Sequence, residues 1–236
     1  MIEVRGLTKA FGKVKVLSGI DAAFAPGRVT AVLGPNAAGK TTLLKTILGL
    51  TRADAGEILM NGIVIGADPS YRSAIGYMPQ LADFPANLKG GELLDMLCSL
   101  RKSAPDPDKS LVKALEITDH LKKQIGTMSG GTRQKVNAVI AFMFRPDLLI
   151  LDEPTAGLDP VASGILKTRI VEARNAGKTV LVTSHIISEV EELADDVVFI
   201  LEGKVRFSGS IASLKAGTRQ HTLERAVAKL MMEVAA

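Results

Sequence analysis

The sequence predicts an α/β fold in which a core of parallel strands carries an antiparallel β region and an inserted helical region. Three observations lead to this prediction. A short apolar run, residues 30–33, leads into a glycine-bounded loop and a leucine-rich helix at residues 40–48. Two apolar runs, "DLLILDEP" and "TVLVTSH", are typical of parallel strands buried on both faces. Helical patterns dominate residues 83–145.

The antiparallel region is predicted from alternation and turns. "MIEVRGLTKAFGKVKVL" alternates apolar and polar residues around Gly12, and "GEILMNGIVI" places Asn61-Gly62 between two strands. "DVVFILEGKVRFSGS" is predicted to be a later hairpin that turns near Gly203. The chain is therefore expected to hold two kinds of sheet.

The helices follow from apolar periodicity and from capping residues. "GGELLDMLCSLR", "PDKSLVKALEI" and "TRQKVNAVIAFMF" are predicted helices of the insertion, with a proline-rich loop, "KSAPDPD", between the first two. Asp159-Pro160 and Gly177 are predicted to bound a crossover helix between the two buried strands. An amphipathic helix is expected at residues 221–234. Residues 1–236 are expected to form one domain, with the helical sub-domain near 83–145.

The composition is that of an ordinary globular protein. Hydrophobic residues make up 47% and charged residues 23%, and aromatic residues are only 4%, so an aliphatic core is expected. A net charge of +4 permits an anionic partner but does not predict one. The single cysteine, Cys98, excludes an internal disulfide and fits a reducing compartment. No apolar window reaches the length of a membrane span.

The loop after the first buried strand fits the pattern G-x-x-x-x-G-K-[ST] from Gly34 to Thr41. Its backbone N–H groups and the following helix N-terminus form a phosphate cradle. Lys40 is placed for the β- and γ-phosphates and Thr41 for Mg²⁺. Kinases, GTPases, helicases and transport motors share this loop, so it does not decide the function.

The run "LLILDEP" supplies two carboxylates at the end of a buried strand. Asp152 is placed to bind Mg²⁺ through its water shell, and Glu153 to reach a water that attacks the γ-phosphate. Acidic side chains also cap helices, so the pair is informative chiefly beside the phosphate loop.

A second helix N-terminus open to an anion is predicted in "MSGGTRQKV", at Ser129, Gly130 and Gly131. With this run, the chain resembles the ATP-binding cassette (ABC) ATPase family, whose signature LSGGQ matches these three residues. The resemblance covers nearly the whole chain and implies a P-loop NTPase core of the RecA-like type. It also implies that the signature of one subunit closes over ATP held by a second, head to tail.

The resemblance assigns further site residues in chain order. It implies an adenine-stacking aromatic at Phe11, a Q-loop residue at Gln80, a D-loop residue at Asp159 and a switch histidine at His185. The expected ATP-binding set is Phe11, Val16, Gly34, Pro35, Asn36, Ala37, Ala38, Gly39, Lys40, Thr41 and Thr42. The expected metal set is Thr41, Gln80 and Asp152, and the expected catalytic pair is Glu153 and His185.

Three positions depart from the family pattern. Ala37 stands where a glycine is common, so a positive φ there would be strained. Thr132 replaces the usual glutamine of the signature and Met128 the usual leucine. These changes affect expectations about turnover rather than about ATP binding.

The resemblance implies Mg²⁺-dependent ATP hydrolysis by a peripheral motor at the cytoplasmic face of the membrane. The expected partners are a separate polytopic membrane subunit and a second copy of the chain, with no nucleic acid. "SGGTRQKV" and "FPANL" further resemble the ATPase of the transporter that supports copper-site maturation of nitrous-oxide reductase.

Two alternatives remain open from the sequence. A soluble ABC ATPase that handles nucleic acid or ribosomes would usually carry tandem cassettes or coiled-coil arms. A P-loop kinase would have no use for the Ser-Gly-Gly run.

We also expect Phe84, Pro85 and Leu88 to line a groove for the membrane subunit, unless they pack the insertion onto the core.

Overall fold

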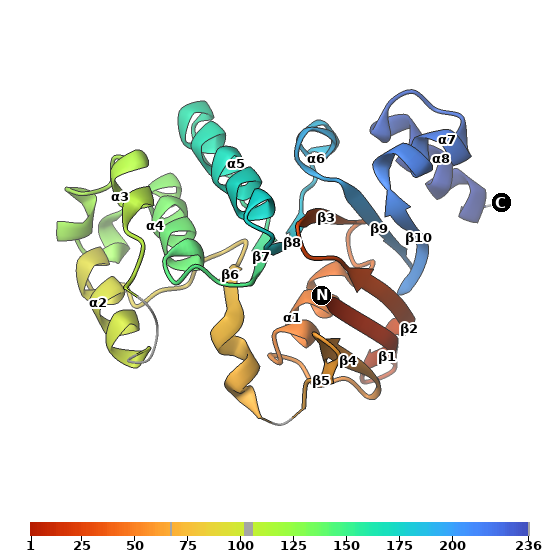
Figure 1. Cartoon of the computed structure of the whole chain (residues 1–236), viewed down its shortest axis with the longest axis horizontal. Helices are drawn as coiled ribbons and strands as arrows, with labels where there is room; N and C mark the ends of the chain where they lie inside the picture. Colours follow the sequence, from red (N-terminus) through yellow and green to blue (C-terminus); the bar gives the residue numbers. More distant parts are fainter. Residues whose placement is uncertain (67, 102–105, 236) are drawn as a thin grey trace.

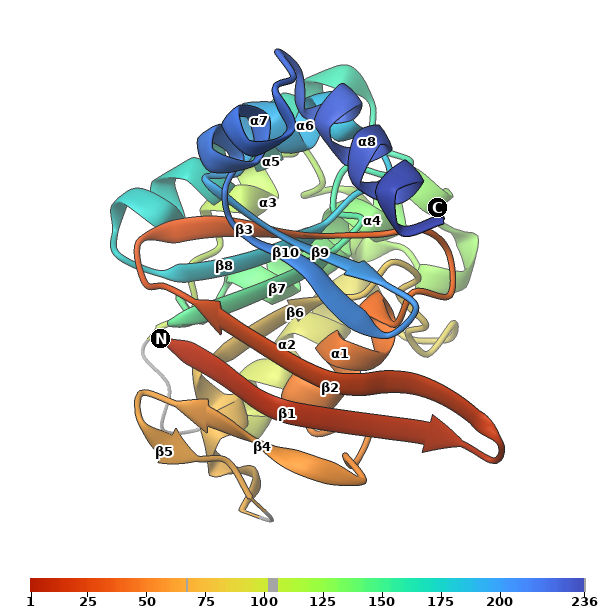
Figure 2. The same cartoon turned by 90° about the vertical axis from the view of Figure 1, so that its right-hand side faces the viewer.

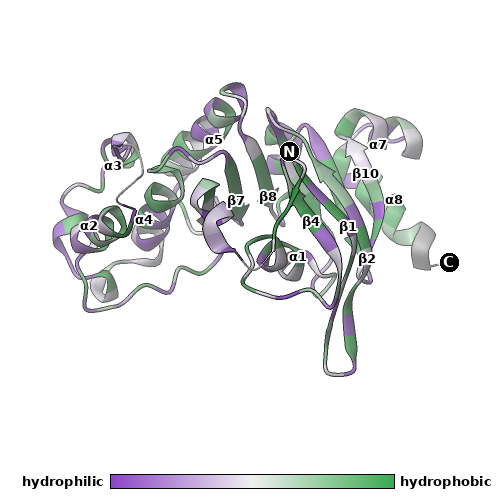
Figure 3. Ribbon diagram, turned by 60° about the horizontal axis from the view of Figure 1, so that its bottom comes forward, coloured by the Kyte–Doolittle hydropathy of each residue, from purple (hydrophilic) through white to green (hydrophobic). Residues whose placement is uncertain are grey.

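The computed structural model describes residues 1–66, 68–101 and 106–235, and a six-stranded sheet lies at its centre. The strand order is β10-β9-β3-β8-β7-β6. The bounds are β3 (Arg28–Leu33), β6 (Ile75–Met78), β7 (Leu148–Asp152), β8 (Thr179–Thr183), β9 (Asp196–Leu201) and β10 (Lys204–Ser210). β10 is antiparallel to β9, and the remaining pairings are parallel. Every residue of β7 and β8 is buried, as predicted, and both strands are largely hydrophobic in Figure 3.

A second, antiparallel sheet forms from the start of the chain, in the order β2-β1-β4-β5. Its strands are β1 (Ile2–Phe11), β2 (Val14–Phe24), β4 (Ala55–Met60) and β5 (Ile63–Val64). The predicted turns at Gly12 and at Asn61-Gly62 are confirmed, and the latter two residues have φ of 51° and 81°. Figure 2 shows the long β1–β2 hairpin in front of the helix α1 (Lys40–Ile47).

Helix α1 fills the space between the two sheets. Its buried residues Leu43, Leu44 and Ile47 share one apolar cluster with Phe24 of the antiparallel sheet and Ile150 of the parallel sheet. This packing holds the N-terminus of α1 at the edge where the parallel strands end.

The other face of the parallel sheet is covered by helices α5 (Pro160–Asn175), α6 (Ile187–Leu193), α7 (Ile211–Thr218) and α8 (Leu223–Ala235). α5 begins as predicted, because the Asp159 carboxylate accepts the N–H of Ala162 at 2.8 Å and Pro160 is its first residue. The crossover between β7 and β8 is therefore a fully capped helix.

The inserted helices form a separate lobe beside β6, at the left of Figure 1. They are α2 (Gly90–Leu100), α3 (Ser110–Ala114) and α4 (Gly130–Phe142), with 3₁₀ turns at His120–Lys122 and Ile125–Thr127. A further 3₁₀ turn, Pro69–Ala74, precedes β6. α3 is shorter than its sequence pattern, because Glu116 takes a φ of 54° and turns the chain out of the helix. Residues 102–105 of the predicted proline-rich loop lie outside the described residues.

Within the described ranges, no helix combines the length and apolar character needed to cross a lipid bilayer. The half-buried Cys98 lies in α2 and packs against the apolar core.

Candidate nucleotide site

The glycine-bounded loop joins the end of β3 to the start of α1 in a conformation that requires its two glycines. Gly34 has a φ of 150°, and a Cβ there would lie 2.1 Å from the carbonyl oxygen of Ile200. Gly39 has a φ of 108°, and its Cβ would lie 2.9 Å from the carbonyl oxygen of Val16. Ala37 takes a φ of 61°, so the strain expected there is present. The motif glycines thus allow the loop to fold tightly against its neighbours.

Lys40 lies at the centre of this loop. Its ammonium donates to the carbonyl oxygens of Gly34 at 2.7 Å and Pro35 at 2.9 Å. Burial lowers the pKa of Lys40, and the nearby carboxylates of Glu153 and Asp152 oppose that shift. The lysine therefore bridges the loop from inside and faces two acidic groups on the opposite wall.

The opposite wall is the carboxyl end of β7 and β8. Asp152 and Thr183 are paired in register, and the Thr183 hydroxyl donates to Asp152 Oδ1 at 2.5 Å. Glu153 follows with a φ of 52°, and its N–H donates to the Thr183 Oγ1 at 3.0 Å and to the Thr183 carbonyl oxygen at 3.2 Å. The two carboxylates thus leave one strand end in different directions.

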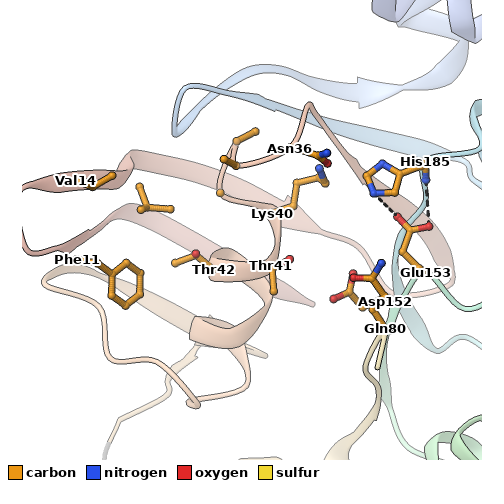
Figure 4. A pocket seen from close by; sticks show the side chains of 14 residues that line it. Phe11, Val14, Asn36, Lys40, Thr41, Thr42, Gln80, Asp152, Glu153 and His185 are labelled. Atoms are coloured by element: carbon orange, nitrogen blue, oxygen red, sulfur yellow. Dashed lines mark hydrogen bonds and ion pairs between the residues drawn. The ribbon is translucent and has the colours of Figure 1, made fainter. Parts of the chain in front are cut away.

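Glu153 and His185 make direct contact, as Figure 4 shows. The backbone N–H of His185 donates to Glu153 Oε2 at 3.2 Å, and the ring nitrogen His185 Nε2 lies 3.2 Å from Glu153 Oε1. Burial raises the pKa of Glu153 above its ordinary value, while the contacts with His185 oppose that shift. A buried carboxylate with a raised pKa is a stronger base than an exposed one.

These side chains face one cavity of about 370 Å³, with an apolar end at Phe11 and an acidic end at Glu153 (Figure 4). The cavity is lined by Phe11, Val14, Val16, Asn36, Ala37, Ala38, Gly39, Lys40, Thr41, Thr42, Gln80, Asp152, Glu153 and His185. Phe11 is 52% exposed, and the ammonium of Lys9 lies 5.3 Å from its ring centroid. Of the predicted nucleotide-binding residues, Gly34 and Pro35 do not line the cavity, although Lys40 contacts both.

Val14 also lines the cavity, although no sequence motif predicted it. It lies two residues before Val16 on β2, so both side chains face the same side of the sheet. Strand alternation was the signal that would have found it.

The predicted signature lies outside this cavity. Ser129 caps α4: its hydroxyl oxygen accepts the N–H of Thr132 at 3.2 Å and lies 2.8 Å from the Thr132 hydroxyl. A Cβ on Gly131 would lie 2.9 Å from the carbonyl oxygen of Gly157, and Lys135 pairs with Asp159 at 2.9 Å. The structure thus brings the signature and the D-loop residue together, but not to the phosphate loop of the same chain.

Two buried amides of α4 connect this helix to the nucleotide site, and the sequence analysis missed them. Asn137 Nδ2 donates to the carbonyl oxygen of Pro79 at 2.8 Å and to Gln134 Oε1 at 3.2 Å. Gln134 Nε2 in turn contacts the carbonyl oxygen of Glu153 at 3.4 Å. Polar residues three apart on the apolar face of a helix were the available signal.

The segment after Gln80 was expected to line a groove, and the structure divides its apolar residues. Phe84 and Leu88 are half-buried and pack against the apolar core, whereas Pro85 is exposed. Leu81 is 86% exposed. The alternative in which Phe84 and Leu88 pack the insertion onto the core therefore agrees with the structure.

A parallel sheet whose strand ends meet a glycine-bounded loop, a lysine and two carboxylates defines a P-loop nucleotide-binding protein. A family model described as "ABC transporter" matches residues 17–156, which is more than half of the chain. The chain therefore belongs to the ABC transporter family, as an ATP-binding cassette of the ABC ATPase class. Cassettes of this class hydrolyse ATP, form dimers and work with membrane subunits.

One curated relative and two solved structures illustrate the likeness. The Nod factor export ATP-binding protein I of Burkholderia lata is 34% identical over 208 residues, covering 86% of this chain and 68% of the relative. A solved ATP-binding subunit of an ABC transporter superposes with a TM-score of 0.89 at 28% identity, covering 98% of this chain and 99% of the other.

The second solved structure is a dimeric ATP-binding cassette in a post-hydrolysis state, bound to ADP and Pi. It has a TM-score of 0.80 and 21% identity, and it covers 89% of this chain and 99% of the other. At that identity the likeness concerns the fold.

Proposed function

We propose that the whole chain, residues 1–236, is one cassette domain that binds Mg·ATP in this cavity and hydrolyses it to power a transporter. The observation that supports this most is the single cavity in which Lys40, Asp152, Glu153 and His185 converge. The helical sub-domain near residues 83–145 and the C-terminal helix belong to the same domain.

The two ends of the cavity are proposed to bind different parts of ATP. Phe11, with Val16 beside it, offers an apolar face on which adenine stacks. The backbone N–H groups of the loop after Pro35, which itself has none, and the positive end of α1 bind the phosphate oxygens, because no side chain caps that helix end. Lys40 then exchanges its two carbonyl contacts for the β- and γ-phosphates.

The residues fit a magnesium ion. Thr41, Gln80 and Asp152 line the same cavity and offer a hydroxyl, an amide and a carboxylate oxygen, the hard donors that Mg²⁺ prefers. When bound with the nucleotide, the ion would neutralise charge on the β- and γ-phosphates. Gln80 also begins the segment that leads into the helical sub-domain.

Glu153 is the proposed general base. A water in line with the γ-phosphate gives its proton to Glu153 as its oxygen attacks phosphorus, and the bond to the ADP oxygen breaks. Burial makes this carboxylate more basic, and the two contacts with His185 hold it in one orientation. His185 contacts the γ-phosphate from the same side.

The proposed dimer places two copies head to tail. Ser129, Gly130 and Gly131 lie away from the cavity of their own chain, and Ser129 and Gly130 are exposed. In the dimer they close over the γ-phosphate held by the second copy. Asp159 lies beside the same surface.

We further propose that the cassette docks on a separate polytopic membrane subunit at the cytoplasmic face of the membrane, without nucleic acid. The exposed Leu81, next to Gln80, is the apolar residue best placed for that contact. A Leu81→Asp chain should melt like the wild type but fail to co-purify with the membrane subunit. Normal co-purification would contradict this assignment.

The direction of transport is proposed to be export, because the relative described above is named for Nod factor export. A link to copper-site maturation of nitrous-oxide reductase stays a prediction that rests on "SGGTRQKV" and "FPANL" alone.

The test is Glu153→Gln, which keeps the shape of the side chain and removes its basicity. ATP should still bind, while hydrolysis falls about 10²–10⁴-fold, as expected for loss of a general base. The control is Glu224→Gln, on the exposed side of α8, which should hydrolyse at the wild-type rate. Wild-type turnover in Glu153→Gln would rule out Glu153 as the base.

A further inference from the structure

Thr183, the last residue of β8, is a buried hydroxyl placed directly beside both carboxylates of the site. It is 1% exposed, and its Cα is paired with that of Asp152 across the sheet. We infer that Thr183 is a positioning residue that fixes the Asp152 carboxylate and the Glu153 peptide relative to each other. This inference rests on the proposed function, in which those groups serve the metal and the attacking water.

The partners of the Thr183 hydroxyl determine which hydrogen bond it donates and which it accepts. A threonine hydroxyl has one proton to donate and two lone pairs that accept. The N–H of Glu153 points at Oγ1 from 3.0 Å, so the oxygen accepts there. The proton is left for Asp152 Oδ1 at 2.5 Å, a bond to a charged acceptor. One hydroxyl therefore orients Asp152, the last residue of the neighbouring strand β7, and Glu153, which follows it.

The backbone of Glu153 turns sharply directly after β7. Its φ of 52° is the left-handed region, which a residue with a side chain occupies only when its surroundings hold it there. Thr183 holds the Glu153 N–H through both Oγ1 and its carbonyl oxygen, and Gln134 contacts the Glu153 carbonyl at 3.4 Å. This turn is what directs the Glu153 side chain toward His185 and the cavity.

Packing alone does not call for a hydroxyl at this position. The rest of β8 includes Val180, Leu181 and Val182, and a valine has nearly the shape of threonine without the cost of burying a polar group. Thr179, at the opposite end of the same strand, is also buried, but it pairs with Leu148 rather than with a residue of the site. Thr179 is therefore a matched control position for Thr183, because it is a buried threonine of the same strand outside the site.

The experiment compares Thr183→Val with the wild type in the full-length chain. Mn²⁺, used as a paramagnetic probe for the metal, is titrated by electron paramagnetic resonance with a non-hydrolysable ATP analogue bound. We expect Mn²⁺ affinity to fall about 10- to 100-fold, the usual effect of losing a partner that orients a metal ligand. Affinity for the analogue without metal should be unchanged, and ATP turnover should fall with the metal affinity.

The controls separate positioning from general stability. Thr183→Ser keeps the hydroxyl and should restore the metal affinity, and Thr179→Val should match the wild type in both titrations. Thr183→Ala is the second hydroxyl-free variant if the valine chain fails to fold. Wild-type metal affinity in a folded Thr183→Val or Thr183→Ala chain overturns the inference, as does equal impairment in Thr183→Ser. A wild-type chain that binds no ATP analogue would instead overturn the proposed function.

Discussion

Two helix N-termini of the described chain, those of α1 and α4, are predicted to bind an anion, and their surroundings differ. The N-terminus of α1 follows a loop in which Gly34 and Gly39 are pressed against neighbouring backbone, and it opens into the cavity. The N-terminus of α4 is capped by its own Ser129, and a Cβ on Gly130 would meet nothing within 4 Å. The N-terminus of α1 lines the cavity together with residues from other strands. The N-terminus of α4 is exposed at Ser129 and Gly130 and lies outside the cavity.

This difference fits the proposal that the two helix ends bind phosphate groups held by different chains. At α1, the opposing wall of Asp152, Glu153 and His185 comes from the same chain. At α4, Ser129, Gly130 and Gly131 do not line the cavity, and the groups near this end of the helix include the Gly157 carbonyl beside Gly131 and Asp159, which pairs with Lys135. In the proposed dimer, the second chain would bring its bound phosphate to α4.

The largest expected contrast comes from the same substitution at both helix ends. Gly39→Ala forces a side chain into a left-handed backbone at about 1–2 kcal/mol and overpacks the loop by about 1–3 kcal/mol. Because the loop keeps its shape only with glycine, we expect ATP affinity to fall at least about tenfold. Isothermal titration with ATP and a melting curve measure both effects.

The matched variant is Gly130→Ala. Its methyl group enters open space at the start of a helix, where alanine is favoured over glycine by about 0.5–1 kcal/mol. The chain should melt no lower than the wild type and bind ATP with unchanged affinity. Equal loss of ATP affinity in the two variants would erase the distinction between the helix ends.

An intermediate effect is expected from pH. Because burial raises the pKa of Glu153 in the folded chain, protonation favours the folded state, and stability is lost as the pH rises through that raised pKa. Without nucleotide or metal, Glu153→Gln should therefore melt above the wild type at pH 8. The difference should vanish below the ordinary pKa of a glutamate. A gap that widens as the pH falls would mean that the shift has the opposite sign.

The smallest effect is expected at Ala37. Its left-handed backbone costs about 1–2 kcal/mol, and a glycine removes that cost while adding about 0.4–1 kcal/mol of unfolded-state entropy. Ala37→Gly should therefore stabilise the chain by about 0–1.6 kcal/mol, measured by denaturant unfolding. Destabilisation would show that the Ala37 methyl group makes contacts that outweigh the strain.

Local pattern predicted most of the fold. Buried strands, two-residue turns and the capped crossover helix were identified because each depends on nearby residues. β6 was missed because it has four residues and contains Gly76, whose Cβ would lie 2.1 Å from the carbonyl oxygen of Ala141. That requirement comes from α4, sixty-odd residues later, and no short window of sequence contains it.

The same limit applies to the cavity. Local motifs predicted Lys40 and Asp152, the family resemblance implied His185, and the structure brings all three to one cavity. Thr183, Gln134 and Asn137 contact the site through pairing of β7 with β8 and through packing of α4, which depend on the tertiary fold. Burial of the Tyr77 ring, together with the negative charge of Asp152, raises the pKa of Tyr77 to about 12, and this burial depends on the tertiary fold.

The most direct test of the difference between the two helix ends is the mass of the Glu153→Gln chain in solution with and without Mg·ATP, alone and combined with Ser129→Arg. Light scattering after size exclusion gives the mass, and titration of the monomer gives ATP affinity. We predict a dimer only with ATP, and a monomer of unchanged ATP affinity once Ser129→Arg is added. A double variant that still dimerises with ATP, or one whose monomer loses ATP affinity, would contradict the assignment of α4 to the site of a second chain.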